Sequence, residues 1–433
     1  MSDLIQPRVL KGFRDFLPAA EINRTDLMEK ITQVYRSYGF VPIDTPVLEY
    51  TEILLRKSNG ETEKQVFRFQ DNGGRDVALR FDLTVPFARF TAEHESELYF
   101  PFKRYHMAKV WRGEKPQAGR YREFVQCDID TVGSDSAAAD FEILSVMKAA
   151  LAAIGVEKIT IHVNHRGVFN RFLAKIGAAE KSEDILRSVD KLAKVGKDAV
   201  QQELADCTGS ADTAAQILSY IAGAGDFDAT LSLIEELAGG EADDTRRLRD
   251  IRAMMQAAGI ADTYVLDPSI TRGLDYYTGI VYETFLDELP SIGSVCSGGR
   301  YDNLAGLYMK NKVPGVGASI GLDRLIAGLE QLGKTTQKGS YLDAEIFCTD
   351  AALSIHYQGV ASQLRAQGIN VEVFPDAKKL GQQYAVTEAK GVQWGILIGK
   401  EEAAAGMLTL KNLKTREQFT GCTVADAVQA IQG

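Results

Sequence analysis

The stretch KRYHMAKVWRGEKPQAGRYREFVQCDIDTVG, residues 103–133, predicts two antiparallel strands and the loop that joins them. The strands are KRYHMAKVWRGE and REFVQCDIDTVG, and the loop between them is KPQAGRY, residues 115–121. Because side chains alternate along a strand, Arg112 and Glu114 are expected to share one face. The sequence therefore predicts a long hairpin of two antiparallel strands.

The basic content of this hairpin indicates an anionic ligand. Residues 103–122 contain seven Lys or Arg and a single acid in a chain whose formal net charge is −10, which favours a specific phosphate or nucleic acid. Arginine forks bind phosphate oxygens in pairs, and an aromatic ring can stack on adenine. The candidate ligand-binding side chains are Arg112, Glu114, Arg120, Arg122, Phe124 and Gln126. A solvated charge run on an exposed hairpin is the alternative.

The composition is that of an ordinary globular protein, and 433 residues suffice for two or three domains. Apolar runs are short and interrupted by Lys or Glu, so no membrane span is predicted. The N-terminus MSDLIQPRVLKG has no apolar h-region, so we expect no signal peptide and a cytoplasmic location. The five cysteines are scattered without a CxxC pair, which is typical of free thiols in a reducing compartment.

No metal site and no standard nucleotide motif are predicted. His162 and His165, the closest histidines, lie in TIHVNHRG, which is typical of a strand end rather than a zinc site. GVGASIG, 315–321, lacks the GxGxxG spacing, and GILIGKE, 395–401, lacks the P-loop spacing and its Ser or Thr. Both are interpreted as structural glycines, so a nucleotide would bind on another scaffold.

Several elements can be placed from their patterns. Residues 20–38 predict an amphipathic helix, and FVPIDTPVLEY after it suits an edge strand because of its prolines. Residues 65–80 predict a hairpin around DNGG, and residues 136–154 an Ala-rich helix. After residue 340, strands and helices alternate regularly up to a final hairpin and helix, which predicts a compact α/β domain.

The chain is accordingly divided into segments. A catalytic domain is expected from residues 1–166 and 263–332, with its polypeptide interrupted by a helical insertion at 167–262, where strand signals are nearly absent. The polar stretch GKTTQKGS, 333–340, predicts a linker before the C-terminal domain, 341–433.

A second informative stretch is SITRGLDYYTGIVYET, residues 269–284. From Thr278 onward it alternates like a strand, but just before that it concentrates Arg272, Asp275, Tyr276 and Tyr277 in six residues. These residues could form a salt bridge and packing at a strand end, or they could belong to a binding site.

Taken together, motifs along essentially the whole chain resemble class II aminoacyl-tRNA synthetases, specifically the histidyl-tRNA synthetase family. The N-terminal segment KGFRDFLP and Pro46 resemble the start of that family and its motif 1. WRGEKPQAGRYREFVQCDID is similar to motif 2, and GVGASIGLDRL to motif 3. TRGLDYYTGIVYE and SGGRYDNL are similar to its histidine signatures, and LIGKEEAAAGMLTLKNLKTREQ to its anticodon-binding domain. The resemblance implies an α/β fold, with an α+β catalytic domain built on an antiparallel sheet flanked by helices.

The resemblance also implies an ATP site. Its residues would be Arg112, Glu114, Arg120, Phe124 and Arg324. Arg112 and Arg272 would be catalytic at the α-phosphate, because negative charge grows there as a carboxylate attacks. Arg120 and Arg324 would hold the γ-phosphate of a bent ATP, Phe124 would stack on adenine, and Mg²⁺ would bridge the β- and γ-phosphates.

The implied histidine site has residues Asp82, Thr84, Gln126, Asp130, Arg272, Tyr276, Tyr277 and Tyr301. Asp82, Thr84 and Gln126 would accept from the ammonium group, although Asp82 is shorter than the acid expected there. Asp130 and Tyr277 would contact the imidazole, and Tyr301 would shape the pocket.

The implied reaction is activation of histidine by ATP and its transfer to the 3′ end of a histidine-specific tRNA, by a homodimer that uses motif 1 as its interface. The main alternative is a non-catalytic relative, the regulatory subunit of ATP phosphoribosyltransferase. A synthetase for proline, threonine or glycine is a third reading, disfavoured by RGLDYY and GGRYD.

Overall fold

The structure is a computed structural model that describes residues 4–55, 60–117, 119–270, 276–335 and 338–433. It divides into two compact units. Unit 1 comprises Met1–Arg14 and Leu27–Lys334, and unit 2 comprises Asp15–Asp26 and Thr335–Gly433. The chain therefore enters unit 2 briefly near its N-terminus before it completes unit 1.

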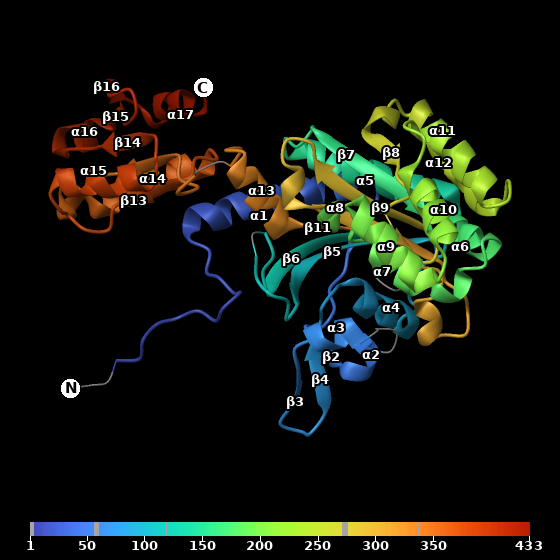
Figure 1. The fold of residues 1–433 in the computed structure, drawn as a ribbon. Coiled ribbons are helices and arrows are strands. Elements are labelled where there is room, and N and C mark those ends of the chain that lie inside the picture. The colour runs from blue at the N-terminus through green and yellow to red at the C-terminus, as the bar shows by residue number, and fades with distance from the viewer. Residues whose placement is uncertain (1–3, 56–59, 118, 271–275, 336–337) are drawn as a thin grey trace. The chain divides into compact units, whose positions relative to one another are not determined.

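Unit 1 is built on an eight-stranded sheet (Figure 1). Its strands, in spatial order, are β1 (Val41–Pro42), β5 (Phe102–Trp111), β6 (Glu123–Val132), β11 (Gly315–Gly321), β10 (Cys296–Arg300), β9 (Ile280–Leu286), β7 (Ile159–His165) and β8 (Tyr264–Leu266). Neighbours are antiparallel except at the two edges, where β1 pairs with β5 and β8 pairs with β7 in parallel. The predicted antiparallel sheet is confirmed, and the proline-containing β1 lies at its edge as expected.

Alternation along β6 separates the core from the opposite face of the sheet. Val125, Cys127 and Ile129 are buried in the main hydrophobic cluster, while the residues between them face the other way. The helices that cover the core face are α1 (Pro18–Ser37, from Leu27 onward in unit 1), α5 (Ala137–Ala153) and α13 (Leu322–Gln331). The Ser136 side chain caps α5 by accepting from the Ala138 amide, which fixes where that helix begins.

Between β7 and β8 the described chain is helical, as its composition predicted. The helices are α6 (Arg166–Lys175), α7 (Ser182–Val189), α8 (Leu192–Val195), α9 (Lys197–Thr208), α10 (Ala211–Ala222), α11 (Phe227–Leu237) and α12 (Asp243–Ala257). Their apolar side chains belong to the same buried cluster as the sheet, for example Ile185 and Ile217, both 0% exposed. These helices therefore extend the core of unit 1 and do not enclose a core of their own.

A small second sheet lies in the N-terminal part of unit 1. It has the order β2 (Leu48–Tyr50), β4 (Asp76–Leu79), β3 (Arg68–Gln70), so the predicted hairpin at 65–80 is confirmed. Around it are the helices α2 (Thr51–Leu55), α3 (Gly60–Gln65) and α4 (Thr84–Glu93). The Asp82 carboxylate accepts from the Val85 amide at 3.1 Å and so helps to start α4.

Unit 2 contains a five-stranded sheet. Its order is β13 (Val371–Val373), β12 (Ala344–Ile346), β14 (Trp394–Leu397), β15 (Leu408–Asn412), β16 (Gln418–Cys422), and its helices are α14 (Ser354–Ala366), α15 (Leu380–Ala389), α16 (Lys400–Ala405) and α17 (Val424–Gln432). The alternating pattern predicted this domain but omitted α16. That helix is a short Ala-rich turn ended by Gly406 in the left-handed conformation, too short to give a helical period.

Candidate active site

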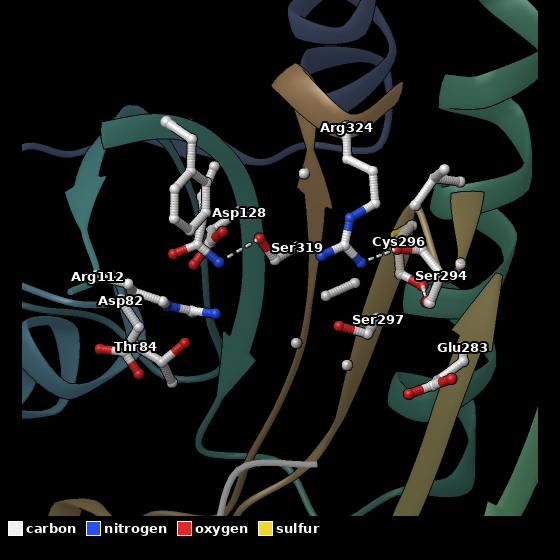
Figure 2. A pocket seen from close by; sticks show the side chains of 18 of the residues that line it. Asp82, Thr84, Arg112, Asp128, Glu283, Ser294, Cys296, Ser297, Ser319 and Arg324 are labelled. Carbon is white, nitrogen blue, oxygen red and sulfur yellow. Dashed lines mark hydrogen bonds between the residues drawn. The ribbon is translucent and has the colours of Figure 1, made fainter. Parts of the chain in front are cut away.

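A cavity of about 320 Å³ opens on the face of the large sheet opposite the core. It is lined by residues of β6, β9, β10 and β11, by the loop after β5 and by the start of α4. Figure 2 shows side chains from these segments pointing into one space. Of the described residues that the sequence assigned to a site, all but Arg122 line this cavity: Asp82, Thr84, Arg112, Glu114, Arg120, Phe124, Gln126, Asp130, Tyr276, Tyr277, Tyr301 and Arg324.

One wall of the cavity is the face of β6 that points away from the core. Phe124, Gln126, Asp128 and Asp130 line the cavity at alternate positions. Asp128 was not identified from the sequence. Its signal was present, because it falls in the period-two series that already contained the three predicted residues.

A fully buried arginine lies under this wall. Arg104 on β5 is directly opposite Asp130 in the antiparallel register, and its Nη2 lies 2.6 Å from Asp130 Oδ2 and 3.9 Å from Asp128 Oδ2. The guanidinium also donates to the Leu83 carbonyl at 3.2 Å and lies over the Phe87 ring. The sequence placed Arg104 only in the basic patch, but its side chain neutralises charge beneath the cavity.

Burial dominates the electrostatics of these acids. It raises the pKa of Asp130 from its ordinary value of 3.8 to about 7 and that of Asp128 to about 6, although Arg104 opposes both shifts. Burial also raises the pKa of Asp82, against the hydrogen bond from Val85 and the charge of Arg112. The cavity floor therefore holds three desolvated carboxyl groups, a setting that favours a cationic or proton-donating ligand.

Tyrosines form the opposite side of the acidic end. Tyr301 donates a short hydrogen bond to Asp130 Oδ1, and Tyr276 donates to Asp82 Oδ2 at 3.0 Å. Tyr277 is held by its backbone, because Arg166 Nη1 donates to its carbonyl at 2.9 Å. The rings of Tyr276 and Tyr277 meet edge to face with centroids 5.1 Å apart. The acids and phenols thus fix one another in a ring-sized polar chamber.

Two glycines of β11 make room for this chamber. A Cβ on Gly317 would lie 2.0 Å from Asp130 Oδ1, and a Cβ on Gly315 would lie 2.4 Å from the Tyr301 ring. The sequence analysis interprets the glycines of GVGASIG as structural, and these short distances give the physical reason. Any larger residue would fill the space that Asp130 and Tyr301 occupy.

The other end of the cavity is cationic. Arg112 Nε donates to the Phe81 carbonyl at 3.0 Å, with its guanidinium 5.2 Å from the Phe124 ring centroid. Arg324, in the first turn of α13, donates to the Ser294 carbonyl at 2.7 Å. Arg120 Nη1 lies 3.7 Å from Glu114. Three guanidiniums from separate parts of unit 1 therefore converge on one space.

Two expectations about the hairpin need correction. Arg112 and Glu114 do not lie within a strand, because β5 ends at Trp111 and both residues follow it. Arg122 does not line the cavity; its Nε donates to the Glu114 carbonyl at 3.1 Å. Arg122 is therefore a brace for the loop and not a ligand-binding arginine.

The N-terminal segment packs against the loop that follows β5. Arg14 forms a close ion pair with Asp323, and its guanidinium lies 3.7 Å from the Tyr121 ring centroid. Asp323 in turn accepts from the Val125 amide at 2.7 Å. The Gly12 carbonyl accepts from the Arg122 amide at 2.8 Å. This segment thus joins the loop after β5, strand β6 and helix α13.

Arg272, predicted to be catalytic and to contact both ligands, lies outside the described residues, as does Asp275. Their positions relative to the cavity stay predictions. Glu283 on β9 lines the cavity and was not identified from the sequence, where it was seen only as a residue of an alternating strand.

An antiparallel sheet of this kind, with arginines and acids converging on its open face and an α/β unit at the C-terminal end, defines a class II aminoacyl-tRNA synthetase. The family model for histidyl-tRNA synthetase matches residues 12–325, and the model for an anticodon binding domain matches residues 345–433. The chain belongs to the histidyl-tRNA synthetase family.

Individual relatives agree with this placement. The histidine–tRNA ligase of Treponema denticola is 62% identical over 408 residues, which are 93% of this chain and 91% of that protein. The histidine–tRNA ligase of Rhodopirellula baltica is 50% identical and covers 96% and 95% of the two chains. The crystal structure of histidyl-tRNA synthetase from Nostoc sp. PCC 7120 aligns with a TM-score of 0.89 at 32% identity over 99% of both chains.

A structure named as an ATP phosphoribosyltransferase regulatory subunit/histidyl-tRNA synthetase from Bacillus halodurans also aligns. Its TM-score is 0.73 at 21% identity, and the alignment covers 88% of this chain and 97% of that one. At this identity the likeness is one of fold alone, so it does not favour the regulatory alternative.

Proposed function

We propose that the chain is a histidine–tRNA ligase, which activates histidine with ATP to histidyl-adenylate and pyrophosphate and then transfers histidine to the 3′ end of its tRNA. The observation that carries the proposal is the division of one cavity. Arg112, Arg120 and Arg324 converge at one end, and Asp130 with Tyr301 forms a polar chamber at the other. A carboxylate held between the two ends would face the α-phosphate of ATP.

Activation is mostly a matter of charge and position. The attacking carboxylate and the triphosphate are both anionic, and charge grows on the α-phosphate oxygens during attack. Arg112 is anchored through Nε to a backbone carbonyl, which leaves its two terminal nitrogens able to meet that phosphate. We assign Arg120 and Arg324 to the γ-phosphate end and Phe124 to adenine. Arg272 joins Arg112 at the α-phosphate on the strength of the resemblance.

Histidine recognition would use the buried acids. The imidazole N–H would be accepted by Asp130, which Tyr301 and Arg104 orient. A site of this kind rejects analogues that lack the N–H, because a buried carboxylate is then left without its donor at about 1–3 kcal/mol. Tyr277 would contact the ring from the other side, and Tyr276 would fix Asp82 through its hydroxyl group.

Magnesium would bind beside the phosphates of ATP and would not need a full set of protein ligands. Mg²⁺ in such sites is held by one or two carboxylates plus phosphate oxygens. Glu114 and Glu283 both line the cavity and could supply those carboxylates. When bound, the ion would neutralise charge on the β- and γ-phosphates and so help pyrophosphate to leave.

The remaining parts of the proposal concern partners. The C-terminal domain, residues 341–433, would bind the anticodon, and residues 333–340 would link it to the catalytic domain. The catalytic domain would consist of residues 1–166 and 263–332, with the helices of 167–262 inserted between them. Within the described residues, no helix is long and apolar enough to span a membrane. The five cysteines form no disulfide among the described residues, which agrees with a cytoplasmic location.

A homodimer is part of the same proposal. Large apolar side chains are exposed on the small sheet and just before it: Val47, Leu48, Tyr50 and Phe69, each at least 40% exposed. They follow Pro46, the residue that resembles motif 1. An exposed apolar group of this kind is typical of a protein interface.

Pyrophosphate exchange with a panel of amino acids tests the function directly. We expect exchange with histidine and none with proline, threonine or glycine. Absence of exchange, together with binding to an ATP phosphoribosyltransferase catalytic subunit, would refute the ligase and support the regulatory alternative.

A further inference from the structure

Besides Asp130 Oδ2, which forms an ion pair with Arg104 at 2.6 Å, two buried acceptor atoms on the β6 wall are left without protein donors. Asp128 Oδ1 and Gln126 Oε1 have no hydrogen-bond partner among the residues that the structure describes. Asp128 is 1% exposed and Gln126 is 9% exposed, so solvent does not replace the missing donors. A buried acceptor without a donor is destabilising, and more so when it carries charge.

Both atoms belong to side chains that line the cavity. Gln126 uses its amide nitrogen to donate to Ser319 Oγ at 2.8 Å, which leaves Oε1 as its unsatisfied end. Asp128 is the next residue on the same strand face. Its nearest cation, Arg104, lies 3.9 Å away and is bound more closely by Asp130, at 2.6 Å. Ser319 also hydrogen-bonds the Asp128 carboxyl group, so Oδ1 is the oxygen that still lacks a donor, and we expect that donor to come from a ligand in the cavity.

Asp82, to which the resemblance gives the ammonium of histidine, is already engaged within the protein. Its Oδ1 accepts from the Val85 amide at 3.1 Å, and its Oδ2 accepts from the Tyr276 hydroxyl at 3.0 Å. These bonds hold the carboxylate at the start of α4.

We infer that Asp128, together with Gln126, binds the α-ammonium group of histidine and is a specificity-determining residue of the amino-acid site. The inference rests on the proposed function and adds to it a residue that the resemblance does not assign. A primary ammonium carries three N–H donors, which match in number the oxygens offered by Asp128, Gln126 and the Thr84 hydroxyl, all of which line the cavity. The imidazole then lies toward Asp130, two residues further along the strand.

The protonation state of Asp128 agrees with this role. Burial raises its pKa to about 6, which leaves the carboxylate mostly ionised under slightly alkaline assay conditions. A bound ammonium would favour the charged form further.

The test is pyrophosphate exchange with Asp128→Asn, which keeps the shape and removes the charge. We expect the KM for histidine to rise at least about 10-fold and the KM for ATP to change less than about 2-fold. Glu123→Gln is the matched control, because it removes a carboxylate from the same strand outside the cavity, where Glu123 pairs with Lys109 at 2.8 Å. The control should leave both constants unchanged.

A ligand without the α-amino group distinguishes the loss of an ammonium contact from a general change in packing around the site. Imidazolepropionate, histidine minus its α-amino group, should inhibit the wild-type protein and Asp128→Asn equally. If the substitution weakens inhibition by imidazolepropionate as much as it weakens binding of histidine, the inference is overturned while the ligase function stands. The same holds if the KM for histidine is unchanged. If the wild-type protein shows no histidine-dependent exchange, the function itself is refuted. Calorimetric binding of histidine without ATP gives the same comparison independently of turnover.

Discussion

Asp128→Asn should be more stable than the wild-type protein, and the difference should grow as the pH rises, although we expect the variant to bind histidine less well. The carboxyl group has a pKa of about 6 in the folded chain, against an ordinary value of 3.8. The folded state therefore retains a proton at pH values where the unfolded state has lost it. Its stability contribution is fully present below the unfolded pKa and is lost as the pH rises through the folded pKa.

The magnitude follows from the shift. Each pK unit corresponds to about 1.36 kcal/mol, so ionising Asp128 destabilises the fold by about 3 kcal/mol once the pH is well above 6. At about pH 5 the penalty is roughly 2 kcal/mol, and at about pH 8 it is roughly 3 kcal/mol. Asparagine does not ionise, so the stability difference between variant and wild type should widen by roughly 1 kcal/mol over this range.

Urea unfolding followed by tryptophan fluorescence measures this difference. The chain has two tryptophans, Trp111 in unit 1 and Trp394 in unit 2, so a Trp394→Phe background makes the signal report on unit 1 alone. Groups far from Asp128 titrate equally in both proteins and cancel in the comparison. Removal of the Asp128 charge also lowers the pKa of Asp130, which adds to the difference in the same direction. A stability difference that stays constant or narrows between about pH 5 and about pH 8 would refute the assigned ionisation of Asp128.

Three further changes test other parts of the site. Gly317→Ala should lower kcat/KM for histidine at least about 10-fold, because the new Cβ would displace the Asp130 carboxylate that lies 2.0 Å from it. Tyr277→Phe should raise the KM for histidine more than the KM for ATP, as exchange assays with each substrate varied would show. Arg14→Ala should raise the KM for ATP roughly 3- to 10-fold without changing the KM for histidine, because Asp323 loses the ion pair that holds the loop after β5.

Each of these has a control or a contrary result. Gly306→Ala is the control for Gly317→Ala, since a Cβ on Gly306 meets no atom within 4 Å. Equal effects of Tyr277→Phe on both substrates would contradict its place at the imidazole. An unchanged KM for ATP in Arg14→Ala, with a lowered melting temperature, would make Arg14 a purely structural residue.

The sequence predicted the elements and the local motifs of the site well, because both follow from short-range patterns. Residues such as Arg112, Gln126 and Arg324 lie in strands, loops and helix starts that periodicity and motif spacing can locate. All of them line one cavity in the folded chain. Their grouping in one site was predicted from the order of the motifs along the chain, because the periodicity of a single segment does not indicate which segments come together.

What the sequence did not reveal depends on contacts between distant segments. The ion pair of Arg14 with Asp323 joins residues 309 positions apart, so no local pattern marks it. Arg104 was counted as part of a basic patch, yet its charge is used inside the fold by a carboxylate on the neighbouring strand. Asp128 was missed for a related reason, because its role depends on which acids already have partners.

The glycines of β11 have a consequence for attempts to change the amino acid that the enzyme accepts. Since Gly315 and Gly317 have no side chain to remove, substitution there can only reduce the chamber. Room for a bulkier amino acid must come from trimming the aromatic rings around it, such as Tyr282, whose hydroxyl donates to the Gly317 carbonyl at 2.6 Å. Libraries aimed at new substrates are best directed at these tyrosines, with the two glycines kept fixed.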